Sequence, residues 1–119
     1  MIDISNELTA RYKAGERNFR GLDLNGEALD LRDSNLAGAD FSESFIFADF
    51  RGANLERSVF DRANVKTCDF RGANLRGASF REAAVDAADF SGAEMTDASF
   101  DGASAQGHIF HSGESPDAV

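Results

Sequence analysis

Tryptophan is absent from this 119-residue chain, and tyrosine and cysteine each occur once. A single cysteine excludes an internal disulfide. No apolar run approaches the length of a membrane span, and the first residues lack the basic and apolar regions of a signal peptide. We therefore expect a cytoplasmic protein with no membrane partner, and the length allows one domain with a modest core.

Basic residues are also scarce, with 12 Lys and Arg against 21 Asp and Glu, a formal net charge of −9. This balance argues against direct binding of nucleic acid, although a basic protein partner stays open. Paired hydrolase carboxylates, a phosphate-binding glycine loop and a Ser–His–Asp set are absent as local motifs. We predict no enzyme activity and no cofactor.

Phenylalanine, by contrast, occurs eleven times and at a fixed spacing. From Phe50 to Phe110 every fifth position, here called the centre, is large and apolar except at Ala105. The residue two places before each centre is small except at His108, and Asp or Asn commonly stands between the two. The centres are Phe50, Leu55, Phe60, Val65, Phe70, Leu75, Phe80, Val85, Phe90, Met95, Phe100, Ala105 and Phe110.

A period of five fits neither a helix nor a strand. If each unit forms one side of a coil and a corner, four units close a turn of about twenty residues, as in a β-helical solenoid. The centre and the residue two places before it then both point inward, and the narrow interior requires one of them to be small. The Asp or Asn between them points outward and bonds the corner backbone.

This coil places residues twenty apart on top of one another. It predicts two ladders of stacked rings on opposite sides of the core. One ladder holds Phe50, Phe70, Phe90 and Phe110, and the other holds Phe60, Phe80 and Phe100.

The motif resembles that of the pentapeptide-repeat family, A(D/N)LXX. The resemblance covers residues 19–110 and is carried by segments such as ADFRG, ANLER, CDFRG, ANLRG, ADFSG and AEMTD. It implies an all-β fold, a right-handed quadrilateral β-helix, in a bacterial protein. The family includes quinolone-resistance and self-immunity proteins that bind DNA gyrase as mimics of duplex DNA, and many members with no assigned role.

The repeat is irregular upstream of Phe50. One residue is missing from the period within the segment SFIFADF, so the coil must tighten or bulge there. Further upstream either Leu29 or Leu31 takes a centre position, which requires an insertion of two residues before Leu36. Imperfect repeats are expected in the first coil of a solenoid.

The chain divides into an N-terminal cap at 1–18, a β-helix at 19–110 and a flexible tail at 111–119. Residues 5–14 favour a short helix, with Ser5 as N-cap and Gly15 just beyond its end. An extended cap is the alternative. The tail has no apolar anchor before its last residue, which is why we expect it to be mobile.

Three residues invite a chemical interpretation. Cys68 stands at an alanine position, which favours a buried small hydrophobe over a reactive thiol. His108 and His111 supply only two of the four ligands of a structural zinc site, so no metal is predicted. An imidazole at the small position of His108 indicates that the regular coil ends there.

Charge is the one surface feature that stands out from the repeat. Residues 51–81 hold seven basic and three acidic residues, whereas residues 82–119 hold eight acidic residues and no Lys or Arg. These acids either keep the solenoid end soluble and unassociated or form a surface for a basic partner. The candidate surface consists of Glu82, Asp86, Asp89, Glu94, Asp97 and Asp101.

Two functions follow. The first is a non-catalytic protein–protein interaction module, and the alternative is a DNA-mimicking inhibitor or protector of DNA gyrase or another topoisomerase. Four to five coils make a rod only about 20–24 Å long, so a mimic would have to double itself. Because no further coil covers Phe110, we predict a homodimer through the C-terminal coil with Ile109 and Phe110 at its centre.

Overall fold

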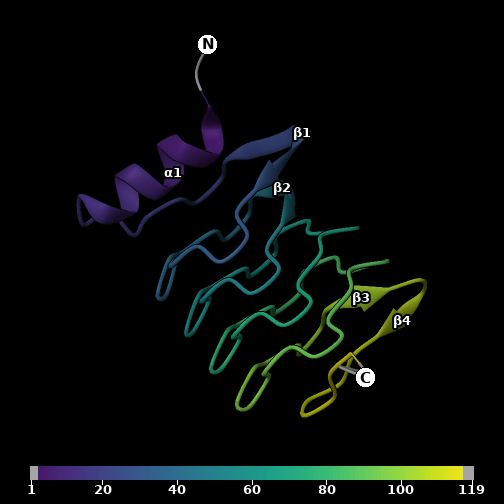
Figure 1. Ribbon diagram of the computed structural model, residues 1–119. Helices are drawn as coiled ribbons and strands as arrows, with labels where there is room; N and C mark the ends of the chain where they lie inside the picture. The colour runs from purple at the N-terminus through teal and green to yellow at the C-terminus, as the bar shows by residue number, and fades with distance from the viewer. Residues whose placement is uncertain (1–2, 117–119) are drawn as a thin grey trace.

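The computed structural model describes residues 3–116, which form a stack of coils with one helix across its first coil (Figure 1). The elements in chain order are α1 (Ile4–Lys13), β1 (Asp23–Asp30), β2 (Phe45–Asp49), β3 (Ser104–Ala105) and β4 (His108–Ile109). Between β2 and β3 the coils are joined by parallel bridges between residues twenty apart, such as Asn54 with Asn74 and Ser79 with Ser99. The predicted twenty-residue coil is confirmed.

The inward positions are those that the period predicts. Phe80 is fully buried, and Ala78, two places before it, is 1% exposed. Outside the core, Asn74 closes the corner because its Oδ1 accepts a hydrogen bond of 3.1 Å from the amide of Arg76. The last residue of a corner adopts a left-handed backbone, which Gly72 supplies at φ 67° and Arg62 adopts at φ 58°.

Two ladders of phenylalanine rings fill the core. Phe50, Phe70 and Phe90 stack with centroids 5.1 and 5.0 Å apart. The second ladder extends further upstream than the sequence predicted, with successive centroids 5.3, 5.3, 4.9 and 4.8 Å apart along Phe19, Phe41, Phe60, Phe80 and Phe100. The two ladders meet edge to face, which locks the rings from two directions.

The missing residue lies in β2, as predicted. Here the side of the coil runs straight, so alternate residues face opposite ways: Ile46 and Ala48 are buried, while Phe45 and Phe47 are 43% and 37% exposed. Straightening lets the chain span the side with one residue fewer.

The inserted residues lie in β1, which pairs in parallel with β2. Asp23 pairs with Phe45, whereas Asp30 pairs with Asp49, and the register shifts between Leu24 and Leu29. Leu29 pairs with Ala48 and so takes the small residue's position. Leu31 is the centre, since its amide donates to the carbonyl of Asp49 at 2.9 Å.

Helix α1 closes the N-terminal end of the stack. Its N-cap is Asp3, whose Oδ1 accepts from the amide of Ser5 at 3.0 Å, so the predicted Ser5 cap is wrong. Instead, Ser5 Oγ accepts from the amide of Asp30 at 3.0 Å, and the Tyr12 hydroxyl donates to the carbonyl of Ala37 at 2.6 Å. These side chains replace hydrogen bonds that a preceding coil would make. Gly15 lies just beyond the helix at φ 99°, as predicted.

At the other end, β3 and β4 form an antiparallel hairpin. The regular coil therefore stops where His108 occupies a small position, as expected. The ring of Phe110 lies 6.4 Å from that of Phe100 and is tilted by 59°. The prediction that Phe110 continues the ladder of Phe90 is wrong, because the hairpin reverses the chain and brings Phe110 over the other ladder.

Candidate interaction surfaces

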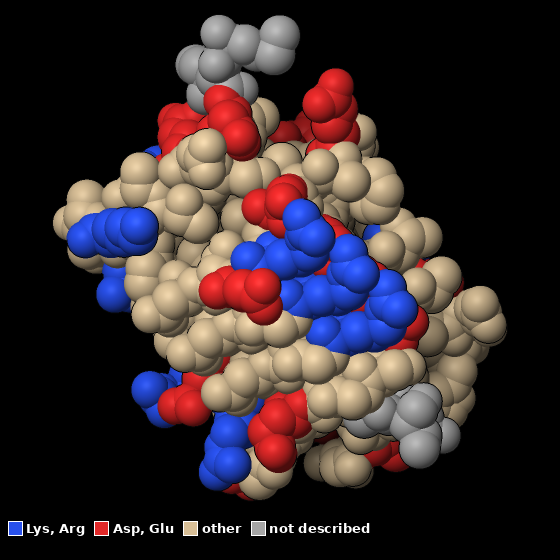
Figure 2. Space-filling model, viewed as in Figure 1, with Lys and Arg blue, Asp and Glu red and all other residues tan. Residues whose placement is uncertain are grey.

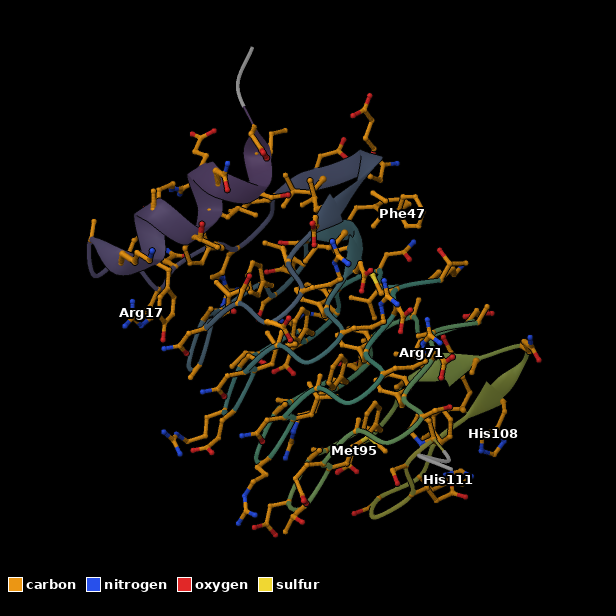
Figure 3. The ribbon with its side chains drawn as sticks, viewed as in Figure 1. Arg17, Phe47, Arg71, Met95, His108 and His111 are labelled. Carbon is orange, nitrogen blue, oxygen red and sulfur yellow. The ribbon has the colours of Figure 1, made fainter. Side chains whose placement is uncertain are left out.

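Outward side chains stack in columns because the coil repeats every twenty residues. One column, here called the Asp–Arg column, consists of Asp30, Arg32, Asp49, Arg51, Asp69, Arg71 and Asp89. The guanidinium of Arg71 lies 2.7 Å from Asp69 and 3.7 Å from Asp89 in the next coil. Figure 2 shows a cluster of Lys and Arg side chains on the face that carries Arg71 in Figure 3.

The carboxylates and guanidinium groups of this column neutralise one another. Hydrogen bonds from Arg32 lower the pKa of Asp30 to about 2. Arg51 and Arg71 likewise lower the pKa of Asp49 and Asp69. Exposed ion pairs of this kind each contribute little stability. Each guanidinium already pairs with carboxylates, including one in the next coil. The column therefore joins neighbouring coils.

The six carboxylates predicted as a partner surface do not share one face. They stand beside centres on all four sides of the last coil, so they surround the C-terminal end of the solenoid. We call this set the acidic ring: Glu82, Asp86, Asp89, Glu94, Asp97 and Asp101.

Several members of the acidic ring contact the protein itself. Asp86 accepts from the amide of Gln106 at 2.9 Å, and Asp101 accepts from the amide of Gly113 at 3.3 Å. The hydroxyl of Thr96 donates to Glu94 at 2.6 Å and lowers the pKa of that carboxyl. The ring is therefore partly fixed in place, and its role in partner binding stays a prediction.

The two residues of the predicted dimer interface differ in exposure. Ile109 on β4 is 51% exposed, whereas Phe110 is half-buried against Phe100. Beyond them the chain turns, with the amide of His111 donating to Glu114 Oε1 at 2.6 Å. The dimer and the mobility of the tail both stay predictions, and residues 117–119 lie outside the described part of the chain.

Cys68 and the histidines show no sign of a reactive centre. Cys68 is fully buried, its thiol donates to the carbonyl of Ile46 at 3.2 Å, and burial raises its pKa to about 12. Within residues 3–116, no group of three or more His, Cys, Asp or Glu side chains could hold a metal ion. The helix in the same range is too short and polar to cross a membrane.

Sequence reasoning missed two features near the N-terminal end. Phe45 and Phe47 project outward from β2, as the labelled Phe47 shows in Figure 3. The residue missing from the period could have indicated this exposure, because a straight strand places alternate residues on the outside. The second feature is a groove of about 660 Å³ between α1 and β1. It depends on how the helix packs, which the period does not reveal.

Comparison with known proteins agrees with this architecture. The family model for pentapeptide repeats matches residues 44–77 and 76–111, in eight copies. The crystal structure of the pentapeptide repeat protein Rfr23 from the cyanobacterium Cyanothece 51142 matches with a TM-score of 0.67 at 16% identity, covering 87% of this chain and 95% of that chain. Such neighbours imply a right-handed quadrilateral β-helix.

Two further solved structures match with lower scores. The pentapeptide repeat protein alr5209 from Nostoc Pcc 7120 is 25% identical, with 92% of this chain and 87% of that chain covered and a TM-score of 0.46. The plasmid-mediated fluoroquinolone resistance protein QnrB1 is 16% identical, with 72% and 68% covered and a TM-score of 0.38. The search of curated protein sequences found no match.

Proposed function

Because the chain belongs to the pentapeptide-repeat family, we propose that it is a non-catalytic protein–protein interaction module that works in the cytoplasm. The observation that supports this function is the acidic ring on a rigid coil. The backbone beneath it is fixed by the stacked rings of Phe80 and Phe100, 4.8 Å apart. A rigid surface loses little conformational freedom on binding, so more of its contact energy appears as affinity.

The charge of the ring selects the partner. From residue 82 to the end of the chain there are eight acidic residues and no Lys or Arg. Two of the ring's carboxylates lie near an arginine of the preceding coil, Asp89 at 3.7 Å from Arg71 and Glu82 at 3.9 Å from Arg62. Such a field attracts a basic protein surface and speeds its association. We propose a partner that presents a basic patch, such as the DNA-binding surface of an enzyme.

A DNA-mimicking inhibitor or protector of gyrase or another topoisomerase is the second candidate. It draws on the same charge and on the family's gyrase-binding members. The molecule measures 40 Å along its longest axis. A two-fold dimer through Ile109 and Phe110 would join two acidic rings into one longer acidic rod, and Ile109, which is 51% exposed, is available for that contact.

Capture from a bacterial lysate tests the interaction module. Wild type is compared with Glu94→Lys/Asp97→Lys in the acidic ring. Asp33→Lys is the matched control, because Asp33 and Asp97 are both exposed corner residues with a left-handed backbone, at φ 57° and 62°. A partner bound by wild type and the control but lost by the double variant supports the proposal. The same partners recovered with all three proteins would contradict it.

The gyrase alternative has two tests of its own. Supercoiling by purified gyrase should be inhibited by wild type and much less by Glu94→Lys/Asp97→Lys, and no inhibition by wild type would remove this candidate. The mass in solution tests the dimer, since a monomer near 12.8 kDa at all concentrations, unchanged by Phe110→Asp, would overturn it. A dimeric wild type with a folded, monomeric Phe110→Asp variant would support the interface.

A further inference from the structure

The groove of about 660 Å³ lies at the opposite end of the solenoid from the acidic ring, beside α1 and β1 (Figure 1). Its apolar lining comes from Ile4, Leu24, Ala28 and Leu29. Ile4 is 43% exposed, which makes it one of the most exposed large apolar residues that the structure describes. Exposed apolar surface in a concave site is typical of a binding site.

The backbone of β1 forms one wall of this groove. β1 pairs with β2 along one edge, and no strand pairs with its other edge within residues 3–116. In the following coils that edge is occupied, as where the amide of Asn54 donates to the carbonyl of Ser34 at 2.8 Å. On β1, α1 takes over this role at Asp30 through Ser5 Oγ. Between Leu24 and Leu29 the register with β2 shifts, so residues 25–28 bulge out of the ladder. The bulge lies beside the groove, and the described helix makes no hydrogen bond to it.

The charge of the lining is of one sign. Four carboxylates surround the groove, those of Asp3, Asp23, Glu27 and Asp30, and no Lys or Arg lines it. Asp3 caps the helix and Asp30 pairs with Arg32 at 2.9 Å. For Asp23 and Glu27 no ion pair occurs within residues 3–116. Both side chains are exposed and available to a cation.

We propose that this groove binds an extended basic segment of a partner protein, which lies between α1 and the bulge of β1. Its Lys or Arg side chains would contact Asp23 and Glu27, and its apolar side chains would pack on Ile4 and Leu24. The site lies beyond the proposed function, because it uses none of the acidic ring and fails or succeeds independently of it.

Binding is measured with a fluorescein-labelled six-residue peptide of alternating lysine and valine, by fluorescence anisotropy. Asp23→Lys/Glu27→Lys should weaken the affinity about tenfold or more, since each reversal replaces an attraction with a repulsion. The neutral pair Asp23→Asn/Glu27→Gln should give an intermediate loss. Asp33→Lys, at an exposed position in neither the groove nor the acidic ring, is the control and should bind like wild type. Circular dichroism and Tyr12 fluorescence show that each variant is folded.

Two measurements separate binding in the groove from simple charge attraction. Bound peptide should slow amide hydrogen exchange in residues 23–28. A lysine–serine peptide of the same length should bind more weakly, because it keeps the charge but has no apolar side chains for Ile4 and Leu24. The proposal is overturned if the first double variant binds like wild type, or if a glutamate–valine peptide binds equally well. It is also overturned if the lysine–serine peptide binds as tightly, or if protection appears at the acidic ring instead.

Discussion

Phe80→Ala tests the stacked core most directly. The ring of Phe80 lies between those of Phe60 and Phe100, with centroids at 4.9 and 4.8 Å. It also meets the edges of Phe70 and Phe90 at 5.6 and 5.8 Å, so one truncation removes contacts with four rings in three coils. The small inward residues on either side of it, Ala78 and Ala83, are too short to fill the space that the ring would leave.

The cost follows from burial. A fully buried phenylalanine truncated to alanine typically loses about 3–5 kcal/mol, from lost transfer energy and the cavity left behind. Because other rings pack closely against Phe80 on four sides, we expect the cost of Phe80→Ala to lie in the upper half of that range. A domain of this size has about 5–15 kcal/mol of stability in total. We therefore expect the loss of a large fraction of it, and a fall in melting temperature of about 10 °C or more.

Urea unfolding followed by circular dichroism is the assay, with Tyr12 fluorescence as a second probe at the N-terminal cap. Arg76→Ala, on the outside of the neighbouring side, is the control and should change stability by no more than about 0.5 kcal/mol. Phe110→Ala should cost less than half as much as Phe80→Ala, because Phe110 is half-buried and touches only one ring of the ladders. If Phe80→Ala and Arg76→Ala shift the midpoint equally, the assignment of inward positions is refuted.

Four further predictions test the corners, the small positions and the charges. Ala78→Leu should destabilise by about 1–3 kcal/mol in the same urea assay, because the residue is 1% exposed and has no spare volume, and a tolerated leucine would argue against the narrow coil. Ala87→Gly should stabilise by up to about 1 kcal/mol, since Ala87 has a left-handed backbone at φ 57°, and a lower melting temperature would count against this reason. Cys68 should react with a thiol reagent only as fast as the protein unfolds, because its thiol is buried with a pKa of about 12, and rapid labelling under native conditions would contradict its burial. The pair of Asp30 and Arg32 should stabilise the fold above about pH 4, where an unfolded Asp is ionised, and lose that effect as pH falls through the folded pKa of about 2, so Asp30→Asn should lower the urea midpoint at pH 7 but not near pH 2.

The repeating part of the fold could be predicted from the sequence because its physical cause is local. A period of five with a small residue two places before a large one leaves one arrangement in which both fit inside a coil. The position of the missing residue followed from the same period, and the structure confirms it in β2. Even Leu29 and Leu31, left as alternatives, both proved inward-facing, one at a small position and one as a centre.

The ends could not be predicted because they depend on contacts between distant segments. Phe110 keeps the period, yet a turn at Gln106 and Gly107 reverses the chain before it. Ser5 has the chemistry of an N-cap, but its hydroxyl accepts from Asp30, far along the chain, and Asp3 takes the cap. The acidic ring was predicted as a set of residues, while its distribution around the coil required the register of the bridges.

The constant number of residues in each coil fixes the distance between the two ends of the solenoid. After β2 every bridge joins residues twenty apart, so each five-residue unit adds one side of a coil. The number of these units sets the distance between the groove at β1 and the acidic ring. A block of twenty residues inserted there would move the ends apart by about 4.8 Å and keep every column aligned. A block of five would instead turn one end by a quarter of a revolution relative to the other. Distance and orientation between two bound partners could thus be set separately, by counting residues.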